Sequence, residues 1–255
     1  MEYIIGYNGN MKIAVCLSGQ LRQSWRKCLP TWLQTFSEHE AHYFGHTWTT
    51  RSAPNFVKVT KGVDDLEEVS NNEMQELKRE LPNLDLTVMK QIEFPAGLDQ
   101  ALHDVNYQSQ FYGVMYSAFM KKRYEIENNS NFDLCIRLRW DTMFDEQWQV
   151  PEPKKDTVQV IHLGFDQQGH RMRVGDLYWQ APTDVYDISC DFFSHFNRHP
   201  INFFNMNSDL HYGPEHVFAY YLKESNLYLE QIYPPIKLVR PKEEHMTGGG
   251  DYETV

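Results

Sequence analysis

Along the chain, short apolar runs typical of strands alternate with longer segments whose apolar positions recur at helical spacing. The strand-like runs are 12–18, 41–46, 85–89 and 133–141, and the helical patterns are 24–36, 64–81 and 108–128. Strands that alternate with helices build βαβ units, in which the strands are parallel and helices cover the sheet. The first half of the chain therefore predicts a mostly parallel α/β sheet flanked by helices.

The second half is patterned less regularly. We expect strands at 157–163 and 176–181, a glycine-punctuated polar loop at 164–176, and helices at 183–196 and 214–226. There is no internal repeat and no low-complexity linker that would divide the chain into two folding units. The expected organisation is one domain over 11–240 with a less regular C-terminal half, an N-terminal extension at 1–10 and a flexible tail at 241–255.

Charge and composition exclude several classes of partner. The 255 residues carry 24 basic and 35 acidic side chains, a formal net charge of −11, which disfavours broad binding to nucleic acid or anionic lipid. No apolar run is long enough to span a bilayer, and the N-terminus has no signal-type segment. The four cysteines are far apart and form no C-x-x-C pair. We expect reduced thiols, a cytoplasmic location, no transmembrane segment and no nucleic-acid partner.

The stretch "IRLRWDTMFD", from Ile136, is unusually charged for a strand-like run. Side chains alternate along a strand, so Arg137, Arg139 and Asp141 share one face while apolar residues occupy the other. In a mostly parallel sheet both faces are covered, and arginines there require acidic or phosphate partners. The alternative is an edge strand that carries a surface set of salt bridges.

The position of Asp141 suggests a ligand site. Ligands of open α/β sheets bind beyond the carboxyl ends of the strands, where Asp141 is expected. A carboxylate at that place can hold a divalent cation, which in turn can hold a diphosphate.

Five segments together resemble a known family. They are "MKIAVCLSGQLR" from Met11, "YFGHTW" from Tyr43, "FDLCIRLRWDTMF" from Phe132, "GDLYWQAPTDVYDI" from Gly175 and "GPEHVFAYYLKESNL" from Gly213. In this order, and over most of the chain from Met11 to about Leu229, they are similar to a glycosyltransferase family found in bacterial, phage and large-virus genomes.

The resemblance implies a GT-A-like fold that binds a nucleotide-diphosphate sugar. Its D-x-D element grips a divalent cation, Mn²⁺ or Mg²⁺, together with the diphosphate, and Asp141 matches the last acid of that element. Arg139 replaces the first acid, and Trp140 stands where relatives often have proline. Because arginine can bind a diphosphate in bidentate geometry, Arg137 and Arg139 are expected to share or replace the role of the metal.

Two further strand ends carry candidate substrate-binding residues. Ser18, Gly19 and Arg22 join a strand to a helix and could bind an anion through backbone N–H groups, although the P-loop signature is absent. The alternative is a tight turn beside a surface charge. His46 and Trp48 end the second strand, where an aromatic ring could stack on the nucleotide base. A satisfied histidine and a packed tryptophan are equally compatible with the pattern.

Candidates for catalysis lie in the second half. Asp176, directly after the polar loop, is the first choice for acceptor contact or general base, and Glu215 is the second, although the helix dipole alone explains an acid there. The loop 164–175 combines glycines with the cations His170, Arg171 and Arg173 and suggests a lid, against the alternative of an ordinary solvent loop. Asp209 and His211 could ligate metal or bind acceptor.

These features favour a glycosyltransferase that moves a sugar from a nucleotide-diphosphate donor to a hydroxyl of a glycan, lipid-linked or protein acceptor. The rival is a non-catalytic nucleotide- or carbohydrate-binding protein on the same fold, because fold does not fix function. A phosphoryl or sulfuryl transferase is a further rival, which the missing phosphate loop disfavours.

Overall fold

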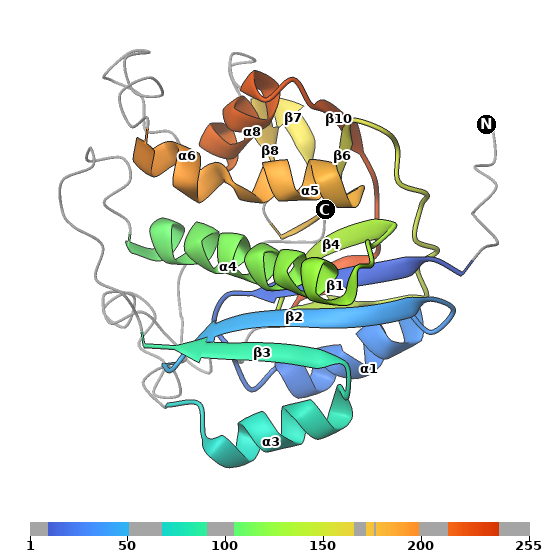
Figure 1. Ribbon diagram of the computed structural model, residues 1–255, viewed down its shortest axis with the longest axis vertical. Helices are drawn as coiled ribbons and strands as arrows, with labels where there is room; N and C mark the ends of the chain where they lie inside the picture. Colours follow the sequence, from blue (N-terminus) through green and yellow to red (C-terminus); the bar gives the residue numbers. More distant parts are fainter. Residues whose placement is uncertain are drawn as a thin grey trace, which may run out of the picture.

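A seven-stranded sheet in the order β10-β6-β9-β4-β1-β2-β3 forms the centre of the fold (Figure 1). The computed structural model describes residues 10–50, 68–90, 105–165, 172–175, 177–198 and 214–239. The strands of the sheet are β1 (Lys12–Ser18), β2 (Glu40–Trp48), β3 (Leu84–Met89), β4 (Leu134–Arg139), β6 (Thr157–Val160), β9 (Tyr178–Ala181) and β10 (Tyr228–Gln231).

The sheet is mostly parallel. β1 pairs in parallel with β2 and β4, β2 with β3, and β10 with β6, whereas β9 runs antiparallel to both β4 and β6. The predicted mostly parallel α/β sheet flanked by helices is thus confirmed. β4, which carries the charged pattern, lies in the middle of the sheet. The alternative interpretation of this segment as an edge strand is therefore wrong.

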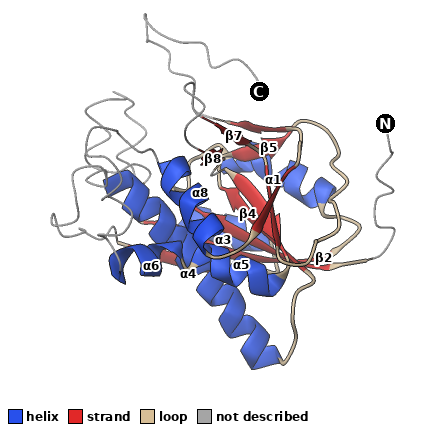
Figure 2. Cartoon of the chain, turned by 90° about the horizontal axis from the view of Figure 1, so that it is seen from above, coloured by secondary structure: helices blue, strands red, loops and turns tan. Residues whose placement is uncertain are grey.

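Helices cover both faces of the sheet (Figures 1 and 2). α4 (Val105–Asn128), α5 (Thr183–Cys190), α6 (Phe192–Arg198) and α8 (Pro214–Glu224) contribute to one apolar core, which includes Phe111, Val185 and Phe218. α1 (Trp25–Thr35) and α3 (Asn71–Glu80) contribute to the other, which includes Trp32 and Leu77. Each face of the sheet is therefore buried by its own set of helices.

The alternation predicted for β4 is confirmed by the two cores. Ile136, Leu138 and Trp140 lie in the core on the α1 side, whereas Cys135 lies in the core on the α4 side. Arg137, one position on from Ile136, has no exposed surface. The charged residues of β4 thus belong to the face that α4 covers, toward the carboxyl end of the strand.

Several element boundaries differ from expectation. The helix expected over 64–81 begins only at Asn71. Ser70 caps this helix, because its hydroxyl accepts a hydrogen bond from the Glu73 backbone N–H. Glu68, which was expected in the helix, forms a β-bridge with Thr50. The helix expected over 183–196 is two helices separated at Asp191. Each break follows a local signal: a capping serine at the first, and a chain turn at the second.

Two small antiparallel pairs were not predicted. β5 (Thr142–Phe144), which follows the charged strand β4, pairs with β11 (Ile236–Leu238). β7 (Leu163–Phe165) pairs with β8 (Met172–Val174). The expectation of a simple polar loop over 164–176 is therefore wrong where β7 and β8 pair. The four cysteines are buried and free, as expected. Within the described ranges, no helix has the length and apolar character needed to cross a membrane.

Candidate functional site

The parallel strands bring the predicted residues of three segments to one edge of the sheet. β1, β2 and β4 are neighbours that run in the same direction, so their carboxyl ends meet there. Ser18 at the end of β1 lies in register with Arg139 at the end of β4, and Trp48 ends β2. The edge is the location that the sequence predicted for a ligand.

Asp141 lies between two arginines at this edge. Arg139 donates from Nε to Asp141 Oδ1 at 2.9 Å and from Nη2 to Oδ2 at 2.8 Å, a bidentate pair. Arg22, in the loop after β1, places its Nε 4.0 Å from the same Oδ2. The Asp141 side chain is 3% exposed, whereas those of Arg22 and Arg139 are 17% and 22% exposed. Solvent therefore meets the guanidinium groups and not the carboxylate.

The chain around Asp141 is held by contacts with distant segments. The Trp140 indole donates to the backbone carbonyl of His46 at 3.0 Å, which ties the end of β4 to the end of β2. The Val239 amide donates to the Asp141 carbonyl at 2.8 Å, and the Trp32 indole donates to the Thr142 carbonyl at 2.6 Å. These bonds fix the backbone on both sides of Asp141, which a functional site requires.

The loop after β1 has the conformation needed to present Arg22. Gly19 has φ of +109°, a region that residues with a Cβ rarely adopt, and among the described residues no atom beyond its chain neighbours lies within 4 Å of the point where a Cβ would stand. Leu21 is fully buried, and its amide donates to the Thr47 hydroxyl at 2.9 Å. The loop is thus anchored on one side of Arg22, while Gly19 leaves room for a ligand to approach the backbone.

Arg137 lies deeper than the other two arginines. Its Nη1 donates to the Leu177 carbonyl at 2.8 Å, and its guanidinium lies 5.4 Å from the Trp179 ring centroid. Trp179 in turn packs on Phe218 of α8 at 4.8 Å. Arg137 therefore links β4 to β9 and α8, and its predicted role as a direct diphosphate ligand stays a prediction.

Ser18 and His46 form a buried polar pair beneath α4. A Cβ at Gly113 would lie 2.9 Å from His46 Nδ1 and 3.6 Å from Ser18 Cβ, so both side chains lie against this glycine. Within the described part of the chain, the Ser18 hydroxyl and both ring nitrogens of His46 have no hydrogen-bond partner. Burial lowers the pKa of His46 to about 4, so the ring is neutral at physiological pH.

Trp48 is packed between aromatic neighbours. Its side chain is 1% exposed, the His46 ring meets it edge-on at 4.7 Å, and Tyr112 of α4 stacks on it at 5.7 Å. A nucleotide base could reach this ring only if Tyr112 moved. Base stacking on Trp48 accordingly remains a prediction, and the packing supports the alternative of a core tryptophan.

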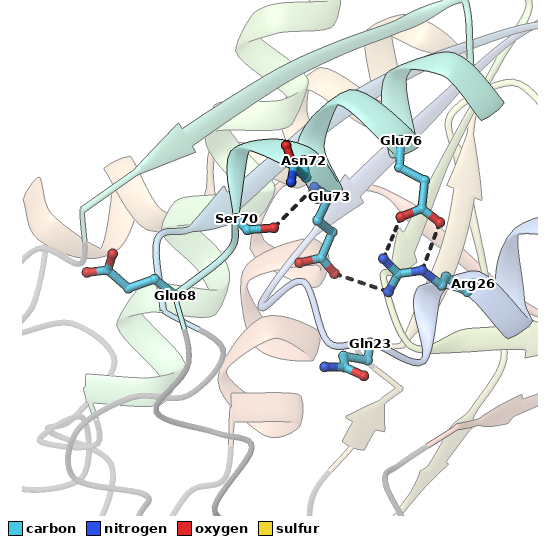
Figure 3. A pocket seen from close by; sticks show the side chains of 7 residues that line it. All are labelled: Gln23, Arg26, Glu68, Ser70, Asn72, Glu73 and Glu76. Carbon is cyan, nitrogen blue, oxygen red and sulfur yellow. Dashed lines mark hydrogen bonds and ion pairs between the residues drawn. The ribbon is translucent and has the colours of Figure 1, made fainter.

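The structure also contains a pocket that the sequence did not predict. It has a volume of about 730 Å³ and lies between the first turns of α1 and α3 (Figure 3). Arg26 donates to both carboxylate oxygens of Glu76, at 2.9 and 2.6 Å, and this hydrogen bonding lowers the pKa of the Glu76 carboxyl. The lining residues are Gln23, Arg26, Glu68, Ser70, Asn72, Glu73 and Glu76.

Only local signals for this pocket exist in the sequence. Ser70 and Glu73 have the S-x-x-E spacing of a helix start, which places a polar helix end there. Glu73 is 2% exposed, and the cost of burying its carboxylate is offset by the Trp25 indole N–H, which it accepts at 3.0 Å, and by Arg26 at 3.5 Å. Gln23, which lines the pocket, directly follows Arg22 in the loop after β1. That the starts of α1 and α3 enclose a pocket could not be read from the sequence.

Of the two predicted catalytic residues, the structure describes Glu215 but not Asp176. Glu215 lies in the first turn of α8, the helix whose Phe218 packs on Trp179. Asp176, His170, Arg171, Asp209 and His211 lie outside the described residues. Arg173 lies in β8. The expected general base at Asp176 and the expected lid thus stay predictions.

Comparisons with known proteins give only distant similarity. No protein-family model and no curated protein matches the sequence. Among solved structures, the apo form of the glycosyltransferase GlyE of Streptococcus pneumoniae TIGR4 is similar with a TM-score of 0.41 and 9% sequence identity, over 88% of this chain and 46% of that one. This chain thus spans about half the length of that structure, and a similarity of this degree does not assign a family.

Proposed function

We propose that this protein is a GT-A-like glycosyltransferase that uses a nucleotide-diphosphate sugar as donor. The observation that carries the proposal is the meeting of Arg22 and Arg139 at Asp141, on the carboxyl edge of a mostly parallel sheet. That edge is where such sheets bind ligands, and guanidinium groups are the donors best suited to a diphosphate.

The two arginines fit the charge that develops during sugar transfer. The bond between the anomeric carbon and the β-phosphate oxygen breaks, its electron pair leaves with the nucleoside diphosphate, and an acceptor oxygen bonds to the anomeric carbon. Arg22 and Arg139, fixed at the edge, would stabilise the leaving diphosphate. The proton of the acceptor hydroxyl would pass to a carboxylate, for which Asp176 and Glu215 are the candidates.

The pocket between α1 and α3, whose lining residue Gln23 follows Arg22 in the chain, is a suitable place for the nucleoside. Its volume of about 730 Å³ is within the range of small-molecule sites. Gln23, Asn72 and Glu68 offer amide and carboxylate groups that can hydrogen-bond ribose hydroxyls and base N–H groups. The diphosphate would then extend from the loop after β1 toward Arg139.

A second candidate is a non-catalytic nucleotide- or carbohydrate-binding protein. One observation favours it: both carboxylate oxygens of Asp141, the acid that matches the D-x-D element, are engaged by Arg139. A protein that had lost turnover while keeping ligand binding could retain such an internal pair. The two candidates share the binding site and differ in turnover alone.

The test is the release of nucleoside diphosphate from a panel of nucleotide sugars, with and without sugar, lipid-linked and peptide acceptors. A glycosyltransferase is expected to release nucleoside diphosphate from at least one donor, faster when its acceptor is present, with slow hydrolysis in its absence. Binding of a donor without release under all acceptors would favour the non-catalytic alternative. Absence of both binding and release would contradict the proposal.

A further inference from the structure

The charges around Asp141 do not suit a divalent cation. Metal ligation by a carboxylate requires an oxygen that can turn toward the ion, and here Arg139 engages Oδ1 and Oδ2 at 2.9 and 2.8 Å. Arg22 lies 4.0 Å from Oδ2, so an ion at this carboxylate would also face a second guanidinium. Among the residues that the structure describes, no three His, Cys, Asp or Glu side chains group together as a metal site.

The same charges do suit an anion. Arg22, Arg139 and Asp141 sum to one formal positive charge, and the exposed part of the cluster belongs to the arginines. The open backbone at Gly19 lies in the same loop as Arg22, and the end of β1 is in register with Arg139. An incoming diphosphate therefore meets the guanidinium groups of Arg22, in the loop after β1, and Arg139, at the end of β4, before it meets the carboxylate.

We propose that Arg22 and Arg139 bind the donor diphosphate directly, in place of a divalent cation, and that Asp141 is the internal counterion that holds them in position when no donor is bound. This inference rests on the proposed function and adds to it the means of donor binding. Phosphate oxygens would take over guanidinium N–H groups that Asp141 accepts in the free protein. Donor binding would consequently not depend on divalent metal.

Asp141 provides the sharpest distinction between the two modes of binding. If Asp141 were a metal ligand, Asp141→Asn would weaken metal-dependent binding of the diphosphate. If Asp141 is a counterion, the same substitution removes a competing negative charge while keeping the shape of the side chain. Binding in the absence of metal should then strengthen by about three- to tenfold.

The experiment is calorimetric titration of ADP, GDP, UDP and dTDP into the full chain, once with Mn²⁺ and once with EDTA. We expect at least one nucleotide to bind with similar affinity in both conditions, more tightly to Asp141→Asn, and about tenfold more weakly to Arg139→Gln. Since Arg139→Gln removes the bidentate partner of a buried carboxylate, the double variant Arg139→Gln/Asp141→Asn supplies a neutral pair, and thermal unfolding checks that each variant folds.

A matched control pair lies on β3 and α4. Arg123 Nη2 lies 3.0 Å from Asp85 Oδ2, and Asp85 is near the start of β3, at the amino edge of the sheet. Arg123→Gln and Asp85→Asn should leave nucleotide affinity unchanged. Binding that requires Mn²⁺ and is lost in Asp141→Asn would overturn the inference and leave the proposed function intact. No binding of any nucleotide in either condition would overturn both.

Discussion

Gly113 of α4 lies directly against the ring of His46 of β2, so that a Cβ at position 113 would come within 2.9 Å of Nδ1. This contact lets the helix pass close over the carboxyl ends of β1 and β2. Ser18, whose Cβ would be 3.6 Å from the same added atom, is covered by the same turn. The close approach therefore seals the deep side of the candidate site.

Gly113→Ala should destabilise the protein. Alanine favours a helix over glycine by up to about 1 kcal/mol, but the added methyl group has to displace the His46 ring in a packed interior, at a cost of about 1–3 kcal/mol. The free energy of unfolding in urea should fall, whereas Ile126→Ala, on the exposed side of α4, should change it little. A Gly113→Ala variant more stable than the wild type would show that the contact has room to relax.

His46 should make stability fall at acid pH. The unfolded chain binds a proton at His46 as pH falls through 6.5, whereas burial keeps the folded ring neutral down to about 4. Acid therefore favours the unfolded state in this window, and between about pH 7 and 4.5 the contribution is about 2–3 kcal/mol.

The measurement compares the pH dependence of unfolding in the wild type and in His46→Leu. The other titratable groups contribute equally to the pH dependence of both proteins, so the difference between the two curves reports on His46 alone. His46→Leu should lose less stability than the wild type over this range. Parallel curves would mean that the pKa of His46 is about the same in the folded protein as in the unfolded chain.

Lys121 should be essential to stability although it is far from the proposed reaction. Its fully buried ammonium group lies 3.1 Å from Glu125 Oε2 and also pairs with Asp187. Lys121→Met leaves these acids without their buried partner and should cost about 3–5 kcal/mol. Lys122 contacts the same two carboxylates but is 51% exposed, so Lys122→Met should cost less than about 1 kcal/mol. Urea unfolding measures both, and equal losses would contradict the assignment.

Filling the pocket between α1 and α3 should separate nucleoside binding from diphosphate binding. Gln23→Trp places an indole among the lining residues next to Arg22. We expect this variant to lose affinity for nucleoside diphosphates and to keep its affinity for inorganic pyrophosphate, measured by calorimetry. Unchanged nucleotide affinity would place the nucleoside elsewhere.

The sequence predicted the parts of the fold that local periodicity encodes. The spacing of apolar and polar residues along the chain predicts the parallel strands, the helices between them and the two faces of β4. The reversed direction of β9 does not, because a short strand after a polar loop has the same pattern in either direction. The start of α3 was placed too early, although Ser70 and Glu73 carry a capping signal.

The candidate site was predictable only in part. The alternation along β4 placed Arg139 on the charged face, and Asp141, in the turn directly after β4, is close to Arg139 because only one residue separates them. The approach of Arg22 to Asp141, and the bond from Trp140 to the His46 carbonyl, join segments far apart in the chain and leave no local pattern. Gly45 shows the same limit: a Cβ there would lie 2.8 Å from the Trp140 ring, a contact visible only in the folded protein.

The central claim, that arginines at the carboxyl edge of the sheet hold the donor diphosphate, is tested most directly on Arg22. Its loop position and partial exposure allow substitution with little effect on the core. The affinity of the tightest-binding nucleoside diphosphate should be measured by calorimetry for the wild type and Arg22→Gln. We expect binding about tenfold weaker in the variant. Equal affinity in two folded proteins would contradict the claim.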